Sequence, residues 1–189
     1  RPGTTGLVNA LKLAAGGSKI LYAASEKRRT KAANPQELLY GDGAAAFVVA
    51  SDAVAAEFLG AKQISVDFVD HYKGDGEDFD YYWEERWIRD EGYMKIVPRA
   101  LEGLFAETEV AASDVDHFIL PCVIRRTGGM VAKAAGIPAE AVSDNLHDVM
   151  GEAGTAHALV MLAQALEQAK PQEIIVIAGF GQGCDALMF

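Results

Sequence analysis

Short apolar runs alternate with amphipathic stretches along the chain, and this pattern predicts an α/β fold. The runs are typical of strands, which we expect at residues 19–25, 44–50, 61–69, 117–120, 173–178 and 184–189, with the first two buried. Apolar side chains that recur every three or four positions predict helices at residues 3–15, 92–106, 126–135 and 155–169. Because strands and helices alternate throughout, we expect a mixed sheet flanked by helices.

Residues 70–91 break this pattern, because charged and aromatic side chains are interleaved there. The aromatic residues are Tyr72, Phe79, Tyr81, Tyr82, Trp83 and Trp87. A stretch this rich in charge is a poor core strand. We therefore expect an inserted loop or cap that covers a site or an interface.

The charge balance excludes one class of partner. The 189 residues include 17 Lys and Arg against 27 Asp and Glu, a formal net charge of −10. No surplus of cations is available to replace the counterions on nucleic acid. No apolar run reaches the roughly 18 residues needed to cross a membrane, and residues 1–5 do not resemble a signal peptide. We expect a cytoplasmic protein that binds neither nucleic acid nor membranes.

The chain has only two cysteines, Cys122 and Cys184. Two are too few for a disulfide framework or for a zinc site made of four thiolates. We expect reduced thiols and no metal, and we expect Cys184 to pack in the core at the start of the last strand.

Three motifs follow one another in a recognisable order. The first is Tyr-Gly-Asp-Gly-Ala-Ala-Ala at residues 40–46. The second combines residues 114–121, which end in Phe-Ile-Leu-Pro, with residues 131–138, which end in Ala-Gly-Ile-Pro. The third is Gly-Glu-Ala-Gly-Thr-Ala at 151–156, followed later by Gly-Phe-Gly-Gln-Gly at 179–183. Together the motifs resemble the thiolase superfamily, on the branch of ketoacyl synthase III and hydroxymethylglutaryl-CoA (HMG-CoA) synthase.

The resemblance implies a thiolase-like fold of layers in the order α-β-α-β-α, built from two similar halves with mixed sheets. Residues 1–52 resemble the end of the N-terminal half, and residues 53–189 resemble the complete C-terminal half with an insert at 70–91. It also implies a coenzyme-A-dependent acyltransferase that forms or cleaves carbon–carbon bonds in acyl thioesters, without a permanently bound cofactor. The family's nucleophilic Cys begins a buried helix. We therefore expect it just before Arg1, where a helix N-terminus would lower the pKa of the thiol.

The chain departs from the family pattern at the residues that polarise the thioester. The family's His falls on Pro121 or Cys122, and its Asn falls on Glu152. An ionised Glu152 would repel an oxyanion, so it fits a general base, or a donor if burial keeps it protonated. We take Glu152, Cys122, His147 and His157 as candidate catalytic residues. We expect the Pro121–Cys122 loop and Glu152 to meet beneath the N-terminal end of the first helix. The competing structural interpretations are a buried apolar thiol for Cys122 and a carboxylate favoured by the helix dipole for Glu152.

An acidic chain needs a local cationic patch if it is to bind an anionic thioester. Arg125 and Arg126 follow the Cys122 loop and are candidates for the substrate entrance, and the basic residues 27–29 are the alternative. Gly181 and Gly183 predict a tight turn that lets the backbone approach a substrate closely.

His71 follows Asp70 in the insert. An Asp-His pair can orient an imidazole as a base, although two adjacent residues rarely face each other usefully.

Two other functions fit the same residues. A thiolase-fold chain without the family's His is typical of a non-catalytic subunit that stabilises an active partner. An aldolase-type lyase would instead use Glu152 or Tyr72 as its base. From the family we also expect an acyl-CoA or acyl-carrier substrate, and a homodimer or higher oligomer formed through the strand at 19–25 or its neighbour. A small zinc-ribbon and OB-fold protein is a further expected partner, docked on the aromatic insert.

Overall fold

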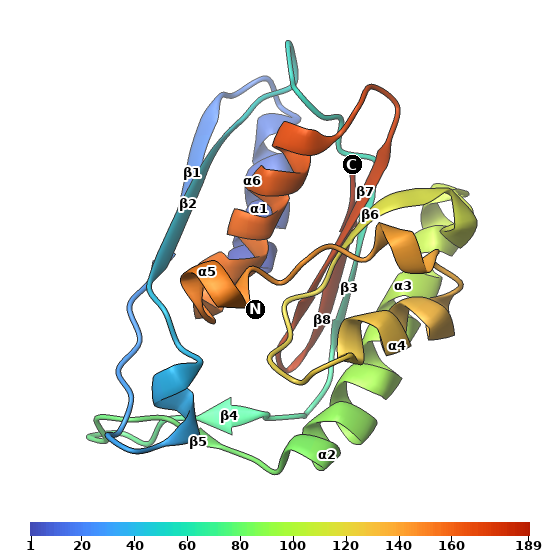
Figure 1. Cartoon of the computed structure of the whole chain (residues 1–189). Coiled ribbons are helices and arrows are strands. Elements are labelled where there is room, and N and C mark those ends of the chain that lie inside the picture. Colours follow the sequence, from blue (N-terminus) through green and yellow to red (C-terminus); the bar gives the residue numbers. More distant parts are fainter.

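The computed structural model describes all 189 residues and is built around a four-stranded sheet (Figure 1). The strand order is β3–β8–β7–β6, formed by Gly60–Ser65, Gly183–Met188, Ile174–Phe180 and Val115–Ile119. β6 and β7 are parallel, and the other neighbours are antiparallel. The predicted α/β class and mixed sheet are confirmed, although β3 ends at Ser65 rather than at residue 69.

Helices cover both faces of this sheet (Figure 1). On one face lie α3 (Met94–Thr108) and α4 (Thr127–Ala135), and on the other lie α1 (Pro2–Ala14) and α6 (His157–Gln168). Small residues such as Ala and Gly are frequent in α1, which lets it pack closely against its neighbours. The sheet is therefore enclosed between two helical layers, as the strand and helix pattern predicts.

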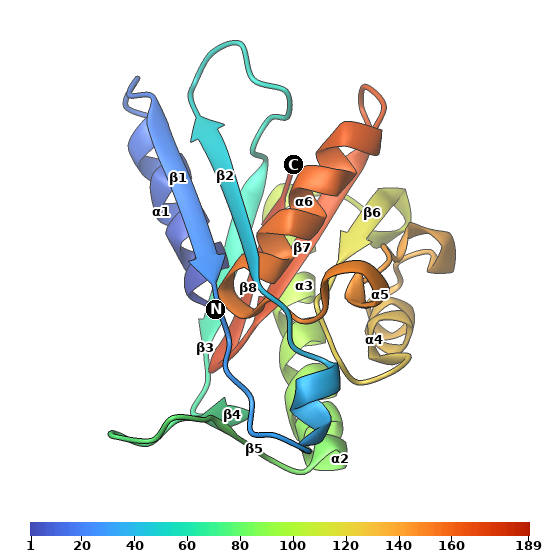
Figure 2. The same ribbon diagram turned by 60° about the vertical axis from the view of Figure 1, so that its left-hand side comes forward.

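A second sheet lies beyond α1 and α6 (Figure 2). β1 (Ile20–Glu26) pairs antiparallel with β2 (Gly43–Val49), which completes a layer order of α-β-α-β. The expectation that both strands are buried is wrong, because successive side chains alternate between half-buried and exposed positions. Leu21 and Val48 are each 72% exposed. Both faces of these strands carry apolar residues, so the sequence does not show which face is covered.

The central strand β7 divides the interior into two clusters. Val176 and Ala178 point toward α3, whereas Ile175 and Ile177 point toward α1 and α6. This alternation follows from the two-residue period of a strand. Every position of β7 between its ends is therefore buried.

The insert begins with a short hairpin formed by β4 (His71–Tyr72) and β5 (Tyr81–Tyr82). Helical structure begins earlier than the predicted residue 92. α2 (Glu85–Trp87) passes through a π-helical stretch, Ile88–Tyr93, directly into α3. The Glu84 carboxylate accepts hydrogen bonds from the first free N–H groups of this helix, which explains where it starts.

The remaining helical elements are short and lie in the connections between the longer elements. They are the 3₁₀ turns Pro35–Leu38, Ala112–Asp114, Ala139–Ala141 and Gly154–Ala156, and the short helix α5 (His147–Met150). None of the helices combines the length and the apolar character that a bilayer crossing requires.

Candidate functional site

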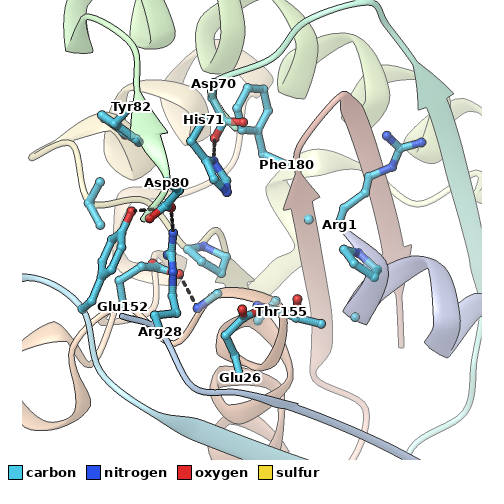
Figure 3. A pocket seen from close by; sticks show the side chains of 18 of the residues that line it. Arg1, Glu26, Arg28, Asp70, His71, Asp80, Tyr82, Glu152, Thr155 and Phe180 are labelled. Atoms are coloured by element: carbon cyan, nitrogen blue, oxygen red, sulfur yellow. Dashed lines mark hydrogen bonds and ion pairs between the residues drawn. The ribbon is translucent and has the colours of Figure 1, made fainter. Parts of the chain in front are cut away.

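A cavity of about 550 Å³ lies at the N-terminal end of α1 (Figure 3). Its walls include the first turn of α1, the loop after β1, the β4–β5 hairpin, the loop after β6 and the turn before α6. Pro121 and Glu152 line the same cavity as Arg1, Pro2 and Gly3. The predicted convergence of the loop after β6 and of Glu152 at the end of the first helix is therefore confirmed.

A buried carboxylate fixes the first turn of α1. Asp185 on β8 is fully buried and lies 2.8 Å from the Arg1 Nε atom, which donates to it. The hydroxyl groups of Thr4 and Thr5 also donate to Asp185, at 3.1 and 2.5 Å, and the Gln63 side chain donates at 3.1 Å. These charge-assisted hydrogen bonds compensate for the burial of a negative charge. They also hold the cavity-lining end of α1 against the sheet.

Backbone contacts place Glu152 in the cavity wall. Its N–H donates to the Leu39 carbonyl at 2.6 Å, and the Gly41 N–H donates to the Glu152 carbonyl at 3.1 Å. A Cβ atom on Gly41 would lie 1.8 Å from the carbonyl oxygen of Met150, so only glycine permits this approach. The first and third sequence motifs are thus joined directly, and their glycines set the position of Glu152.

The Glu152 carboxylate is the centre of a small polar cluster. One oxygen accepts a hydrogen bond from the Gly154 N–H at 2.7 Å. The other oxygen lies 3.4 Å from Nε2 of His147 and 3.3 Å from Nδ1 of His157. The side chain is 14% exposed, so one part of it still faces the cavity.

The hydrogen bonds of His157 show which of its ring nitrogens carries a proton. Nδ1 accepts from the Ala153 N–H at 3.1 Å, so Nε2 carries the proton and donates to the Asn145 carbonyl at 2.6 Å. This ring is fully buried. His147, Glu152 and His157 bring three ligand atoms within 4.8 Å of one another, but the Nδ1 lone pair is already engaged and is not free for a cation.

The environment of Glu152 favours its ionised form. Burial acts to raise the pKa, but the hydrogen bond with His147, the Gly154 N–H and the charge of Arg28 outweigh it. The pKa of Glu152 therefore lies below its ordinary value. A carboxylate in this state accepts protons and does not donate a hydrogen bond.

Acidification is expected to destabilise the fold through Glu152. Because its pKa is lower in the folded than in the unfolded chain, the stabilising effect is complete above the ordinary value of 4.5 and is lost as the pH falls through the folded-state pKa. Thermal unfolding of the wild type and of Glu152→Gln, followed by circular dichroism between pH 7 and pH 3, measures this effect. The melting temperature of the variant should fall less steeply below pH 4.5; parallel curves would contradict the assignment.

A second polar cluster ties the loop after β1 to the hairpin (Figure 3). Arg28 Nη2 donates to Asp80 at 2.6 Å, and the Tyr40 hydroxyl donates to the same carboxylate at 3.1 Å. The Arg28 guanidinium carbon lies 3.5 Å from the centre of the Tyr40 ring, a cation–π contact. Burial raises the pKa of Tyr40 well above its ordinary value, so its hydroxyl remains a donor. This contact makes the insert part of the cavity wall, in agreement with its predicted role as a cap.

The four candidate catalytic residues occupy different depths. Glu152 lines the cavity, whereas His147 and His157 lie behind it and do not reach the lining. Cys122 is 4% exposed and lies outside the lining, with its thiol directed to the Ile124 carbonyl at 3.7 Å. Burial raises the pKa of this thiol to about 11. Its position matches the alternative interpretation, a buried apolar thiol.

The candidate binding residues also lie outside the lining. Arg125 and Arg126 are exposed on the loop before α4. Gly181 and Gly183 form the turn between β7 and β8, where Arg1 Nη1 donates to the Gly181 carbonyl at 2.8 Å. The basic residues that do line the cavity include the predicted alternative, 27–29.

Three polar residues of this region were not identified from the sequence. The sequence could have indicated Asp185, because it is a single acidic residue inside an otherwise apolar closing strand. No sequence pattern indicates the pairing of Tyr40 with Asp80, since their contact joins segments 40 residues apart. Such pairs are set by tertiary structure alone.

Family and sequence comparisons match this architecture. The family model for 3-oxoacyl-[acyl-carrier-protein (ACP)] synthase III C terminal matches residues 105–187. The HMG-CoA synthase of Caldivirga maquilingensis is 28% identical over 100% of this chain and 55% of its own length. The β-ketoacyl-[acyl-carrier-protein] synthase III of Lactobacillus delbrueckii subsp. bulgaricus is 26% identical over 79% of this chain and 50% of its own length. The chain thus spans about half the length of these relatives.

Solved structures show the same fold. The 3-oxoacyl-(acyl carrier protein) synthase III of Pseudomonas aeruginosa PAO1 superposes with a TM-score of 0.82 at 20% identity, over 98% of this chain and 62% of that one. The corresponding synthase of Aquifex aeolicus VF5 gives a TM-score of 0.78 at 18% identity, over 98% and 64% of the two chains.

Proposed function

We propose that this chain, which is similar to the ketoacyl synthase III and HMG-CoA synthase branch of the thiolase superfamily, supplies half of the active site of a condensing acyltransferase. The substrate would be an acyl thioester of coenzyme A or of an acyl carrier protein, and the reaction would form or cleave a carbon–carbon bond. The observation that carries the proposal is the single cavity shared by the N-terminal end of α1, Pro121 and Glu152.

The proposed nucleophile is a cysteine joined to the amino group of Arg1 in a longer chain. That position adjoins the cavity, because Arg1 itself lines it. The free N–H groups and the partial positive charge of the helix end would favour a thiolate there. The thiolate would take the acyl group from the thioester and later pass it to the acceptor.

Glu152 is the proposed general base of the second step. Its ionised state suits proton removal from the acyl acceptor and makes it unfit to stabilise an oxyanion. His147 and His157 would act through Glu152 as positioning residues, because both contact its carboxylate from behind. Cys122 has no role in this scheme beyond packing.

Cationic residues support the binding of an anionic thioester. Lys27, Arg29 and Lys73 line the cavity and provide positive charge on a chain of net charge −10. We propose that these three residues bind the substrate inside the cavity. Arg125 and Arg126, predicted from the sequence, would contact the substrate at the outer surface. The turn that contains Gly181 and Gly183 would help to position Arg1 in the cavity wall, because the Gly181 carbonyl accepts a hydrogen bond from the Arg1 side chain.

The proposal also covers the two halves of the fold, the oligomeric assembly and the cellular location. Residues 1–52 would end the N-terminal half of the fold, and residues 53–189 would form the C-terminal half. The exposed row on β1 and β2 that includes Leu21 and Val48 supports a homodimer interface. The exposed aromatic side chains of the insert would suit the zinc-ribbon and OB-fold partner, and the assembly would be cytoplasmic.

The test uses the protein encoded by the complete gene, incubated with acetyl-CoA and measured by intact mass spectrometry. We expect one acetyl adduct per chain, located on the residue before Arg1 and lost when that residue is replaced by Ala. Glu152→Gln should still form the adduct but should slow its transfer to an acceptor by roughly 100-fold. Glu173→Gln is the matched control, since that carboxylate pairs with His117 outside the cavity.

A second candidate function is a non-catalytic subunit of a heteromeric acyltransferase. Pro121 favours it, because proline at the expected His position has no side-chain donor. This function predicts no adduct on the full-length protein and normal assembly of Glu152→Gln with its active partner. The same mass measurement therefore separates the two candidates.

A further inference from the structure

We propose that His71, oriented by Asp70, donates the proton that the leaving thiol requires in this cavity. This inference rests on the proposed acyltransferase function. It assigns the imidazole to the inserted hairpin, whereas the loop after β6 lines the cavity with Pro121 and Val123, whose side chains carry no proton donor.

His71 is the only one of the four histidines that lines the cavity. Both ring nitrogens of His157 are engaged, and His147 contacts Glu152 from behind. His117 lies on β6 and pairs with Glu173 at 2.9 Å. The cavity therefore offers one imidazole to a bound substrate.

The hairpin fixes the orientation of this ring. Nδ1 of His71 lies 3.0 Å from an Asp70 carboxylate oxygen, so the opposite edge of the ring, with Nε2, is directed into the cavity (Figure 3). The Asp70 carbonyl accepts the Trp83 N–H at 3.0 Å, and His71 pairs across the hairpin with Tyr82. The Asp70 side chain is 15% exposed and that of His71 is 43% exposed. A largely buried carboxylate thus orients an imidazole that solvent or substrate can reach.

Several charges surround the imidazole. Asp70 contacts it directly, Asp80 of the same hairpin and Arg28 of the loop after β1 act on it through their charges, and Lys73 and Asp78 line the same cavity. The hydrogen bond with Asp70 raises the pKa of His71 and outweighs both burial and the charge of Arg28. The imidazolium form is therefore more populated near neutral pH than in an isolated histidine.

The proposed step balances in atoms and charge. The cysteine thiolate bonds to the carbonyl carbon, and the carbon–sulfur bond of the incoming thioester breaks. The leaving sulfur takes the electron pair and accepts the Nε2 proton of His71, so it departs as a neutral thiol. His71 is left neutral and regains a proton from solvent before the next turnover. Asp70 acts through His71 and is a positioning residue.

The test measures single-turnover release of coenzyme A thiol from acetyl-CoA by the full-length protein. His71→Ala is expected to slow acylation by roughly 100-fold or more, while the affinity for acetyl-CoA changes little. His117→Ala, the matched control, should acylate like the wild type. His71→Gln retains a polar side chain on the hairpin but cannot titrate, and thermal unfolding of both His71 variants reports whether the fold is retained.

The pH profile separates proton donation from a merely structural role. The wild-type acylation rate should fall as the pH rises through the pKa of His71, and this limb should be absent in His71→Gln. Asp70→Asn should shift the limb to lower pH. A His71→Ala rate and profile equal to those of the wild type would overturn the inference and leave the acyltransferase proposal intact. If the wild type forms no adduct and releases no thiol, both are wrong.

Discussion

Replacing Asp185 by Ala is expected to lower the free energy of unfolding by about 3 kcal/mol, the scale for removing one partner of a buried ion pair. The substitution leaves the Arg1 guanidinium, whose side chain is 14% exposed, without its carboxylate. It also removes the acceptor for the hydroxyl groups of Thr4 and Thr5 and for the Gln63 amide. Urea denaturation at pH 7 measures the change.

Two controls define this effect. Asp52→Ala removes a carboxylate of the same kind that is 72% exposed and 3.8 Å from Lys19, so stability should be essentially unchanged. Asp185→Asn preserves the shape and one acceptor oxygen and should lie between the wild type and Asp185→Ala. Equal denaturation midpoints for Asp185→Ala and Asp52→Ala would show that the buried network does not hold α1 in place.

The second large effect is expected from Gly3→Ala in the first turn of α1. Alanine normally stabilises a helix relative to glycine by roughly 0.5–1 kcal/mol. Here the added Cβ would lie 2.1 Å from the carbonyl oxygen of Thr155, and backbone on both sides prevents an easy adjustment. We expect a loss of about 2–3 kcal/mol, the range of overpacked interiors.

Gly129→Ala in α4 is the matched control for Gly3→Ala. No heavy atom lies within 4 Å of the added Cβ there, so the helical preference of alanine should prevail and the variant should be slightly more stable than the wild type. Chemical denaturation of both variants gives opposite signs if the contact between α1 and Thr155 is as close as described. A stabilised Gly3→Ala protein would contradict it.

Much of the fold follows from local sequence patterns. The glycine after α4 adopts a left-handed conformation and ends the helix where predicted, because Gly136 tolerates that backbone geometry. The apolar period of α6 and the alternation of strands and helices also predicted the correct elements. The exposed faces of β1 and β2 were not predictable, because apolar residues on both sides of a strand conceal which side a neighbour covers.

The candidate site was predictable in part. The order of the motifs indicated that Glu152 and Pro121 would meet at the first helix, and the charged, aromatic insert indicated a cap. The rest depends on distances that no local pattern contains. Cys122 shows this limit, because only packing decides that its thiol faces the core rather than the cavity.

The alternating side chains of β7 have a consequence for how the molecule unfolds. Because Ile175 and Ile177 belong to one cluster while Val176 and Ala178 belong to the other, neither cluster can lose its order without loosening the strand they share. The two sides of the sheet are therefore coupled in one cooperative transition. The amide protons of β7 should be among the slowest to exchange with solvent, and the outer β1–β2 layer should open first.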